Sequence, residues 1–596
     1  MLTMKRSTIF SAVLVTLCTL PFILGSARGI DFQLAHQRWF ANFYSQLSAG
    51  EIYPRWLLSI NGGLGSPALF IYAPLPFYIA SLCGWIMGTG PGGSSLDAAA
   101  ALSLIVSYSG AYFWLKARTG SSEQAGWGAA AYLVFPYHLY LEALHFYAFA
   151  EMWGVACTPL LLLSWELLKR NSKYSSLMAS IASGLVMLSH PLTMIPLGLF
   201  LIWDLAVSWT SRRALSLMGA LSAGAMLAAF YLLPAFEIGP LVASREFVQG
   251  DFHFSKRTLF SPEAQYFAFR AMEEITLLCS MAALLLFKRK DALLRPVLIL
   301  VLFIQFLVTP LAHPLWHLIT PLQLLQTPTR FGILLNIALA IMVSTRAPGF
   351  LQAEGPRAAI LSTISILVLI SSIILTVPLL PQAASYGLFL PPITVGIVVG
   401  WCLLTARYPR GYRWKSSTSE VTAALLLLCL YAFQVYPIVN ELVLSPARPA
   451  EDSALTAFCR PEYRPLSVPS AFYTASTIAE FQQQHGTHYI SASERVHILD
   501  WSPRSISLSA ETPAEIPLTI GQFYMQGWTA HINEVVTPVW PDPDRGLISL
   551  TVPAGSSRID IRLPEYRSEQ AGEIISLITC FLLLGGCVFN SRRPVR

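Results

Sequence analysis

Several short stretches of this 596-residue chain hold polar side chains whose types and spacing could carry out chemistry. The first combines Asp31 and His36, which follow an N-terminal apolar segment. A carboxylate there can act as a general base toward a hydroxyl group, or bind a divalent metal that holds a phosphate, with the histidine assisting. The alternative is a helix N-cap at Asp31 beside a solvated His36, and the spacing favours neither interpretation.

The second stretch is GEIYPRWLLSINGG at residues 50–63, which contains Glu51, Arg55 and Trp56. An arginine beside an aromatic ring, followed by a glycine-rich turn, is suited to binding a phosphate or a sugar. The competing interpretation is an anchor at the membrane surface, with Arg55 reaching the lipid headgroups.

The third stretch is YLEALHFYAFAEMWG at residues 140–154. Glu151 begins an apolar segment, where an ionised carboxylate needs a partner, and carboxylates at membrane depth are candidates for function. A helix-start carboxylate stabilised by the helix dipole is the alternative. We rank Glu151 ahead of Glu142 and His145.

Two further polar positions interrupt apolar sequence. His190, before Pro191, either lines a cavity at a helix break or is a structural histidine at a kink. Gln326 and Arg330 end the segment 313–330 and open an apolar stretch. Arg330 either pairs with a lipid phosphate or with an acid such as Asp31, or it anchors a helix end.

The composition indicates that these residues are positioned by a membrane protein. Hydrophobic residues make up 54% of the chain and charged residues only 12%, against about 25% charged residues in soluble proteins. Apolar windows of spanning length recur up to Leu442. Placing the clusters of Lys and Arg in the cytoplasm predicts about 14 spans with both termini inside, the first span being uncleaved.

That orientation requires residues 69–88 to form an interfacial helix that does not cross the bilayer. The predicted organisation is therefore a transmembrane domain over 1–444, with its first outer loop at 28–68. A polar region over 445–568 follows, and a final span with a cytoplasmic tail covers 569–596. No CxxC or zinc spacing occurs among the nine cysteines.

The region 445–568 contains short runs of alternating apolar and polar residues bounded by turn residues. This pattern predicts an extracytoplasmic antiparallel β-sandwich. The runs are 504–511, 515–521, 527–534, 547–552 and 557–563. Aromatic and acidic residues here, such as Trp528, Trp540 and Asp542, are more typical of a core and its turns than of a sugar site.

The order of these pieces resembles the GT-C superfamily of membrane glycosyltransferases. More narrowly, GEIYPRWLLSINGGLGSPALFIYAPLPFY at 50–78 is similar to the first-loop block of bacterial YfhO-type proteins, which overlap the 6-pyruvoyl-tetrahydropterin synthase-related membrane proteins. FYAFAEMWGVACTPLLLL at 146–163 and LQLLQTPTRFGILL at 322–335 are further similarities. The chain shows no three-histidine zinc set, so we do not predict pterin chemistry.

The resemblance implies an all-α polytopic membrane protein of GT-C type that transfers a sugar from a polyprenyl-phosphate donor to a cell-envelope glycan or protein. Asp31 and Glu151 would be the catalytic acids, assisted by His36. Arg55 and Arg330 would hold the donor phosphate. Substrate contacts are also expected from Glu51, Trp56, His190 and Gln326.

The resemblance places the protein in the bacterial inner membrane, with the β region outside and no nucleic-acid partner. A divalent metal, Mg²⁺ or Mn²⁺, at Asp31 is the one cofactor considered. The alternatives to transfer are a non-catalytic GT-C scaffold and a transporter of lipid-linked glycans. Polar groups that gather near the outer face rather than along the span interiors favour the transferase over the transporter.

Overall fold

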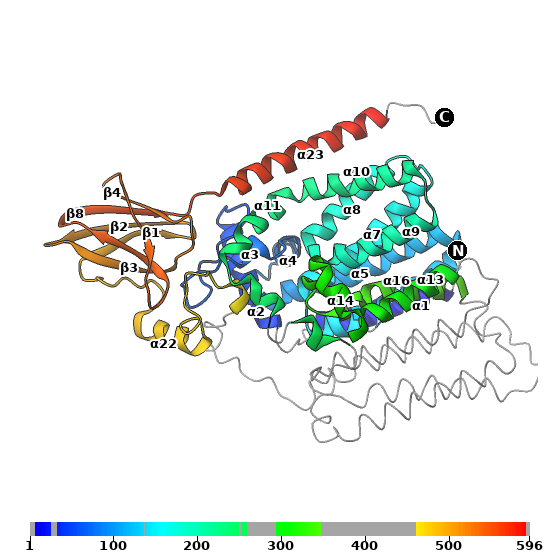
Figure 1. The fold of residues 1–596 in the computed structure, drawn as a ribbon, viewed down its shortest axis with the longest axis horizontal. Helices are drawn as coiled ribbons and strands as arrows, with labels where there is room; N and C mark the ends of the chain where they lie inside the picture. Colours follow the sequence, from blue (N-terminus) through cyan, green and yellow to red (C-terminus); the bar gives the residue numbers. More distant parts are fainter. Residues whose placement is uncertain are drawn as a thin grey trace, which may run out of the picture. The chain divides into compact units, whose positions relative to one another are not determined.

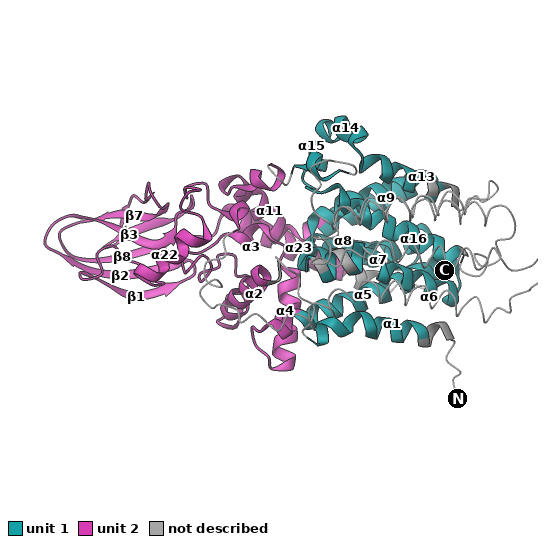
Figure 2. Cartoon of the chain, turned by 90° about the horizontal axis from the view of Figure 1, so that it is seen from below, with its two compact units in different colours: residues 1–33, 97–224, 250–447 teal, residues 34–96, 225–249, 448–596 magenta. Residues whose placement is uncertain are grey.

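The computed structural model describes residues 6–24, 32–135, 137–249, 253–258, 294–346 and 460–591. The chain forms two compact units, each assembled from segments that are far apart in the sequence (Figures 1 and 2). Unit 1 comprises residues 1–33, 97–224 and 250–447, and unit 2 comprises residues 34–96, 225–249 and 448–596. The β region therefore shares its unit with two earlier segments.

Unit 1 consists of helices that run side by side (Figure 2). Small residues permit their close approach: a Cβ built on Gly128 would lie 2.6 Å from Leu115 and 2.8 Å from the Ala340 carbonyl oxygen. The helices are α1 (Arg6–Ile23), α5 (Gly93–Thr119), α6 (Ser122–Val134), η1 (Tyr137–His145), α7 (Phe149–Lys169), α8 (Ser175–Ser189), η2 (Pro191–Thr193), α9 (Met194–Val207), α10 (Ser211–Leu227), η6 (Phe254–Arg257), α13 (Leu294–Leu307), η7 (Pro310–Ala312), α14 (His313–Leu318), α15 (Thr320–Gln323), η8 (Pro328–Phe331) and α16 (Gly332–Arg346).

Helices long and apolar enough to cross a membrane number three among the described residues, or up to five if each bent helix pair is one span. The three are Gly93–Thr119, Pro328–Thr345 and Arg567–Gly586. The spans expected near 272–287, 358–377, 385–405 and 420–440 lie outside the described residues. The total of about 14 spans stays a prediction.

The apolar stretch expected to lie at the interface is broken into two short helices in unit 2. These are α3 (Ala68–Ile71) and α4 (Leu75–Met87), and α4 has 13 residues, against about 20 needed to cross a bilayer. Pro76 occupies the first turn of α4, where a missing N–H costs nothing. Gly88 ends α4 in the left-handed region at φ +66°.

The C-terminal part of unit 2 is an antiparallel β-sandwich, and the five predicted strands are confirmed to within two or three residues. One sheet has the order β1-β2-β8-β4-β5 and the other β3-β7-β6. The strands are β1 (Val496–Ser502), β2 (Ser505–Thr512), β3 (Ile516–Phe523), β4 (Thr529–Ile532), β5 (Val535–Thr537), β6 (Trp540–Pro541), β7 (Leu547–Val552) and β8 (Gly555–Arg562). Asn533 and Glu534, both at positive φ, form the tight β4–β5 turn that such backbone angles favour.

The remaining helices of unit 2 are α2 (Phe32–Ser48), α11 (Ala229–Ile238), η3 (Gly239–Leu241), η4 (Ser244–Val248), η11 (Pro461–Tyr463), α22 (Ala475–His485) and α23 (Arg567–Ser591). Helix α11 packs along α23. The close approach requires a glycine, because a Cβ on Gly572 would lie 2.5 Å from the Ala229 carbonyl oxygen.

Residues of the β-sandwich pack against the glycine-rich turn that follows Trp56. Phe523 N–H donates to the Leu64 carbonyl at 2.7 Å, and Trp56 Nε1–H donates to Gln522 Oε1 at 2.9 Å. A Cβ on Gly65 would lie 2.5 Å from Trp56 Nε1 and 2.6 Å from Gln522 Oε1. The turn therefore joins the first-loop segment to strand β3, and its glycines serve packing.

We expect Gly65→Ala to destabilise unit 2 by about 2–4 kcal/mol, because the added methyl group meets side chains that have no room to move. Gly88→Ala is the matched control: Gly88 also has positive φ, but nothing lies within 4 Å of its Cβ position, so about 1 kcal/mol is expected. Thermal unfolding of the purified protein in detergent measures both, and equal effects would contradict the packing role.

Candidate functional site

The first polar cluster, in unit 1, is centred on Glu151 in the first turn of α7. Its carboxylate is buried and accepts hydrogen bonds from the Tyr137 hydroxyl at 2.6 Å and from Arg330 Nε at 3.1 Å. Burying a carboxylate is costly unless it is paired and hydrogen-bonded, and both conditions are met here. The helix dipole of α7 adds to this stabilisation.

The guanidinium of Arg330 is held in a fixed orientation. Its Nη1 donates to the Leu325 carbonyl at 2.8 Å and to Gln326 Oε1 at 3.1 Å. Gln326 adopts φ +61°, which turns the chain before η8. Among the described residues nothing hydrogen-bonds Arg330 Nη2, and the side chain is 19% exposed. The N–H groups of Arg330 Nη2 therefore remain able to bind an anion.

The segment that carries Tyr137 is unusual in its backbone. Residues 137–145 form a π-helix, a conformation that occurs often at functional sites. Tyr147 follows at φ +50°, and the N–H of Ala148 donates to the Glu142 carbonyl at 2.8 Å. This compact corner places Glu142, which is only 4% exposed, beside Glu151.

His190 also lies near this cluster. The charges of Glu151 and Arg330 act on its imidazole, and its Nδ1 lies 2.9 Å from the Thr193 hydroxyl. A Cβ on Gly154 would lie 2.9 Å from the His190 Cβ, so the histidine packs directly against α7. The structure thus brings together Glu151, His190 and the Gln326–Arg330 segment, which the sequence analysis took from three separate stretches.

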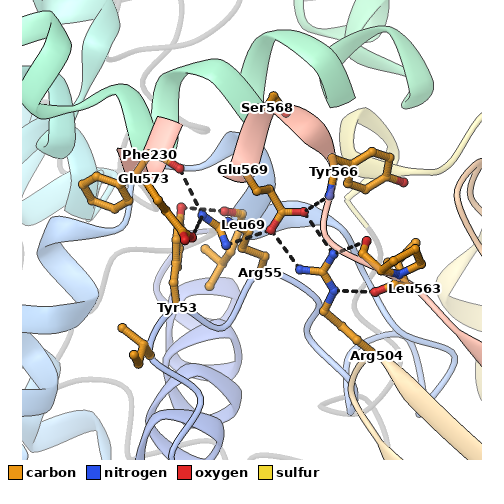
Figure 3. Close-up of polar contacts among 12 residues, drawn as sticks. Tyr53, Arg55, Leu69, Phe230, Arg504, Leu563, Tyr566, Ser568, Glu569 and Glu573 are labelled. Carbon is orange, nitrogen blue, oxygen red and sulfur yellow. Dashed lines mark hydrogen bonds and ion pairs between the residues drawn. The ribbon is translucent and has the colours of Figure 1, made fainter. Parts of the chain in front are cut away.

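The second polar cluster, in unit 2, is centred on Glu569 in the first turn of α23. Figure 3 shows Arg55 and Arg504 approaching its carboxylate. Arg55 Nη1 lies 2.7 Å from Oε2, and Arg504 binds both oxygens at 2.9 and 3.0 Å. Glu569 is fully buried and also accepts the Tyr566 N–H at 2.9 Å, as a helix-capping glutamate does.

Arg55 has further partners in this cluster. Its Nη2 donates to the Phe230 carbonyl at 3.0 Å and to Glu573 Oε1 at 3.3 Å (Figure 3). The guanidinium also lies 4.3 Å from the centre of the Tyr53 ring. In this structure the arginine expected to hold a phosphate ties the first-loop segment to α11 and α23.

Glu51 lies within the electrostatic field of the second cluster. Burial raises the pKa of its carboxyl group to about 7, and the positive charges of Arg504 and Arg55 offset part of that effect. Glu51 is therefore a group of unit 2 that titrates near neutral pH.

Two further predicted residues, His36 and Trp56, make contacts of their own within unit 2. His36 is buried, with Nε2 2.7 Å from the Tyr72 hydroxyl, and its ring packs edge-on against Trp39. Trp56 is fully buried against Trp528. Asp31 lies outside the described residues.

Within the described parts of the chain, no three His, Cys, Asp or Glu side chains gather as metal ligands. Asp31, where a divalent metal was considered, lies outside these residues, so a metal there stays a prediction.

Sequence reasoning ranked Glu142 low and did not single out Tyr137, Arg504 or Glu569. Glu569 had a usable signal, because it is an acid at the start of an apolar helix, as Glu151 is. Tyr137 and Arg504 had none, since an isolated tyrosine or arginine carries no pattern.

Residues 69–385, slightly more than half of the chain, match the model of a family described as "6-pyruvoyl-tetrahydropterin synthase related domain; membrane protein". Curated proteins provide no match. Two solved structures of ArnT from Cupriavidus metallidurans are similar over 84% of this chain. The one bound to undecaprenyl phosphate has 12% identity, TM-score 0.44 and 97% of its own chain covered. The apo structure has 13% identity, TM-score 0.46 and 98% covered. This likeness is too loose to assign a role to any residue.

We expect Glu569→Gln to destabilise unit 2 by about 3–5 kcal/mol, because it leaves two arginines around a neutral buried amide. Glu573→Gln is the control, since Glu573 is 45% exposed and lies 3.3 Å from Arg55, and less than about 1 kcal/mol is expected. Chemical denaturation of wild type and both variants measures the change in the free energy of unfolding. A change below about 1 kcal/mol for Glu569→Gln would show that the cluster does not hold unit 2 together.

The raised pKa of Glu51 predicts a pH dependence of stability. A carboxyl group that binds its proton more tightly in the folded state stabilises that state fully below its ordinary pKa, near 4.5, and the contribution is lost as pH rises through about 7. Stability should therefore decline between these values in the wild type, and this decline should be smaller in Glu51→Gln. Unfolding midpoints across the range test this, and identical profiles would refute it.

Proposed function

This chain belongs to the 6-pyruvoyl-tetrahydropterin synthase related family of membrane proteins, as the resemblance of its sequence implied. We propose that it is an integral-membrane glycosyltransferase. The proposed reaction moves a sugar from a polyprenyl-phosphate donor to a cell-envelope acceptor on the outer face of the membrane. The observation that supports it best is the buried Glu151–Arg330 pair, which leaves one guanidinium nitrogen available.

Arg330 suits the donor's phosphate because its position is fixed before any ligand arrives. Glu151 holds Nε, and Gln326 with the Leu325 carbonyl holds Nη1. A phosphate oxygen at Nη2 would form a charge-assisted hydrogen bond without first ordering a flexible side chain. The same contact would stabilise the negative charge that grows on the phosphate as it leaves the sugar.

In the proposed reaction the acceptor hydroxyl oxygen forms a bond to the anomeric carbon of the sugar. The bond between that carbon and the phosphate oxygen breaks, and polyprenyl phosphate departs with the bonding electrons. The hydroxyl proton passes to a carboxylate base, a role we assign to Asp31 with His36 assisting. A single displacement needs no covalent enzyme intermediate, so the proposal requires no nucleophilic side chain.

Transfer should depend on both members of the buried pair. In proteoliposomes supplied with radiolabelled polyprenyl-phosphate sugars and cell-envelope extract, we expect Glu151→Gln and Arg330→Lys each to lower transfer about 100-fold or more, as removing one oriented charge stabiliser does. Lysine keeps the charge of Arg330 but cannot bind Glu151 and Gln326 together. Asp31→Asn should abolish transfer.

Arg558→Lys is the control, because Arg558 is 68% exposed on the β-sandwich, and it should transfer at the wild-type rate. Transfer that is indifferent to Glu151→Gln and Arg330→Lys in folded protein would contradict the proposal. Movement of the labelled lipid across the bilayer with no transfer to any acceptor would favour a transporter instead. Normal cell-envelope assembly with all three variants would favour a scaffold.

A further inference from the structure

Glu142 and Glu151 form a buried pair of carboxyl groups that the proposed reaction does not yet use. They are 4% and 6% exposed, and their side chains lie within hydrogen-bonding reach of each other. Within the described parts of the chain, the arginine that acts on both carboxyl groups is Arg330. Two ionised carboxylates beside one guanidinium would leave an uncompensated buried negative charge.

The hydrogen bonds indicate where a shared proton would lie. Glu151 accepts bonds from Tyr137 and Arg330, and donors of this kind favour the ionised form of a carboxyl group. No N–H or O–H group in the described part of the chain donates to Glu142 Oε2, which is buried. A carboxylate only accepts hydrogen bonds, so two carboxylates cannot bond to each other. A proton on Glu142 removes this conflict.

We propose that Glu142 is a neutral carboxylic acid whose O–H group donates a hydrogen bond to the Glu151 carboxylate and thereby positions it. Glu151 then receives three donors: the Glu142 hydroxyl, the Tyr137 hydroxyl and Arg330 Nε. Of the residues that the structure describes, the charged and titratable groups that face the pair are Tyr137 from η1, Arg330 from η8 and His190 from the turn before η2. Among the described residues of this cluster, one carboxylate then balances one guanidinium when His190 is neutral.

This neutrality matters for an anionic substrate, and that consequence rests on the proposed transfer reaction. A phosphate approaching Arg330 Nη2 would meet a carboxylate already balanced by its own arginine. If Glu142 also ionised, the site would gain a second negative charge in a medium that screens it poorly, and phosphate binding would weaken. By staying neutral, Glu142 therefore allows a site with two acidic residues to bind a phosphate.

The proton on Glu142 can be observed without turnover. In the infrared difference spectrum of wild type minus Glu142→Gln, recorded in nanodiscs near neutral pH, we expect the carbonyl band of a protonated carboxylic acid, shifted in D2O. Glu534→Gln is the control, because Glu534 is exposed in the β4–β5 turn, and its difference spectrum should show only loss of a carboxylate. The absence of a protonated band for Glu142 would overturn the proposal.

Activity gives a second readout. Glu142→Gln keeps a neutral donor to Glu151 and should transfer within about threefold of wild type, whereas Glu142→Ala should lose about tenfold to hundredfold, the value of one hydrogen bond to a charged group. The wild-type rate should fall at alkaline pH, and Glu142→Gln should lack that decline. Glu142→Gln as inactive as Glu151→Gln would overturn the proposal, even if Glu142→Ala does not fold.

The two readouts separate this inference from the proposed function. A protonated Glu142 band together with no transfer by wild type would leave the carboxyl pair intact and refute the transferase. Normal transfer without that band would refute the pair and leave the transferase standing.

Discussion

Buried charge must be compensated, and this constraint determines how both units of the protein are built. An isolated ion in a low-dielectric interior costs far more free energy than a folded chain can spare. Glu151 and Glu569 meet this constraint in the same way, each in the first turn of an apolar helix and each bonded to arginine. Removing one partner in either cluster would leave the other charge buried and unpaired, and its desolvation would then destabilise the fold.

The two clusters differ in which of their polar atoms lack a protein partner. Around Glu569 the terminal nitrogens of Arg55 and Arg504 bond to protein groups and connect the first-loop segment, the β-sandwich and α23, while Arg55 Nε is buried without a partner among the described residues. Around Glu151, Arg330 Nη2 has no protein partner among the described residues on a side chain that is 19% exposed, and Glu142 Oε2 is buried without one. Unsatisfied buried polar groups are rare, and they mark positions where a ligand or a proton is expected.

Features that depend on local pattern were predictable. The alternation of apolar and polar residues placed β2, β3, β7 and β8 to within two or three residues, because side chains along a strand alternate between core and solvent. The edge strands β1, β5 and β6 were missed. Strands β5 and β6 have three and two residues, too few to show a period, and β1 exposes four consecutive residues instead of alternating. The candidate acid and arginine in unit 1 were recognised one at a time, since a charge in apolar sequence is conspicuous.

The sequence by itself determined that this is a largely apolar membrane protein with a C-terminal β region, since hydropathy and periodicity are summed over neighbouring residues. Only the tertiary structure decided which charges pair. Arg330 was expected to meet a phosphate or an acid such as Asp31, and it meets Glu151, 179 residues away. Arg55 pairs with Glu569, a contact that the sequence analysis did not name. Spacing along the chain carries no record of such contacts, because folding brings distant segments together to neutralise charges that burial would otherwise leave unpaired.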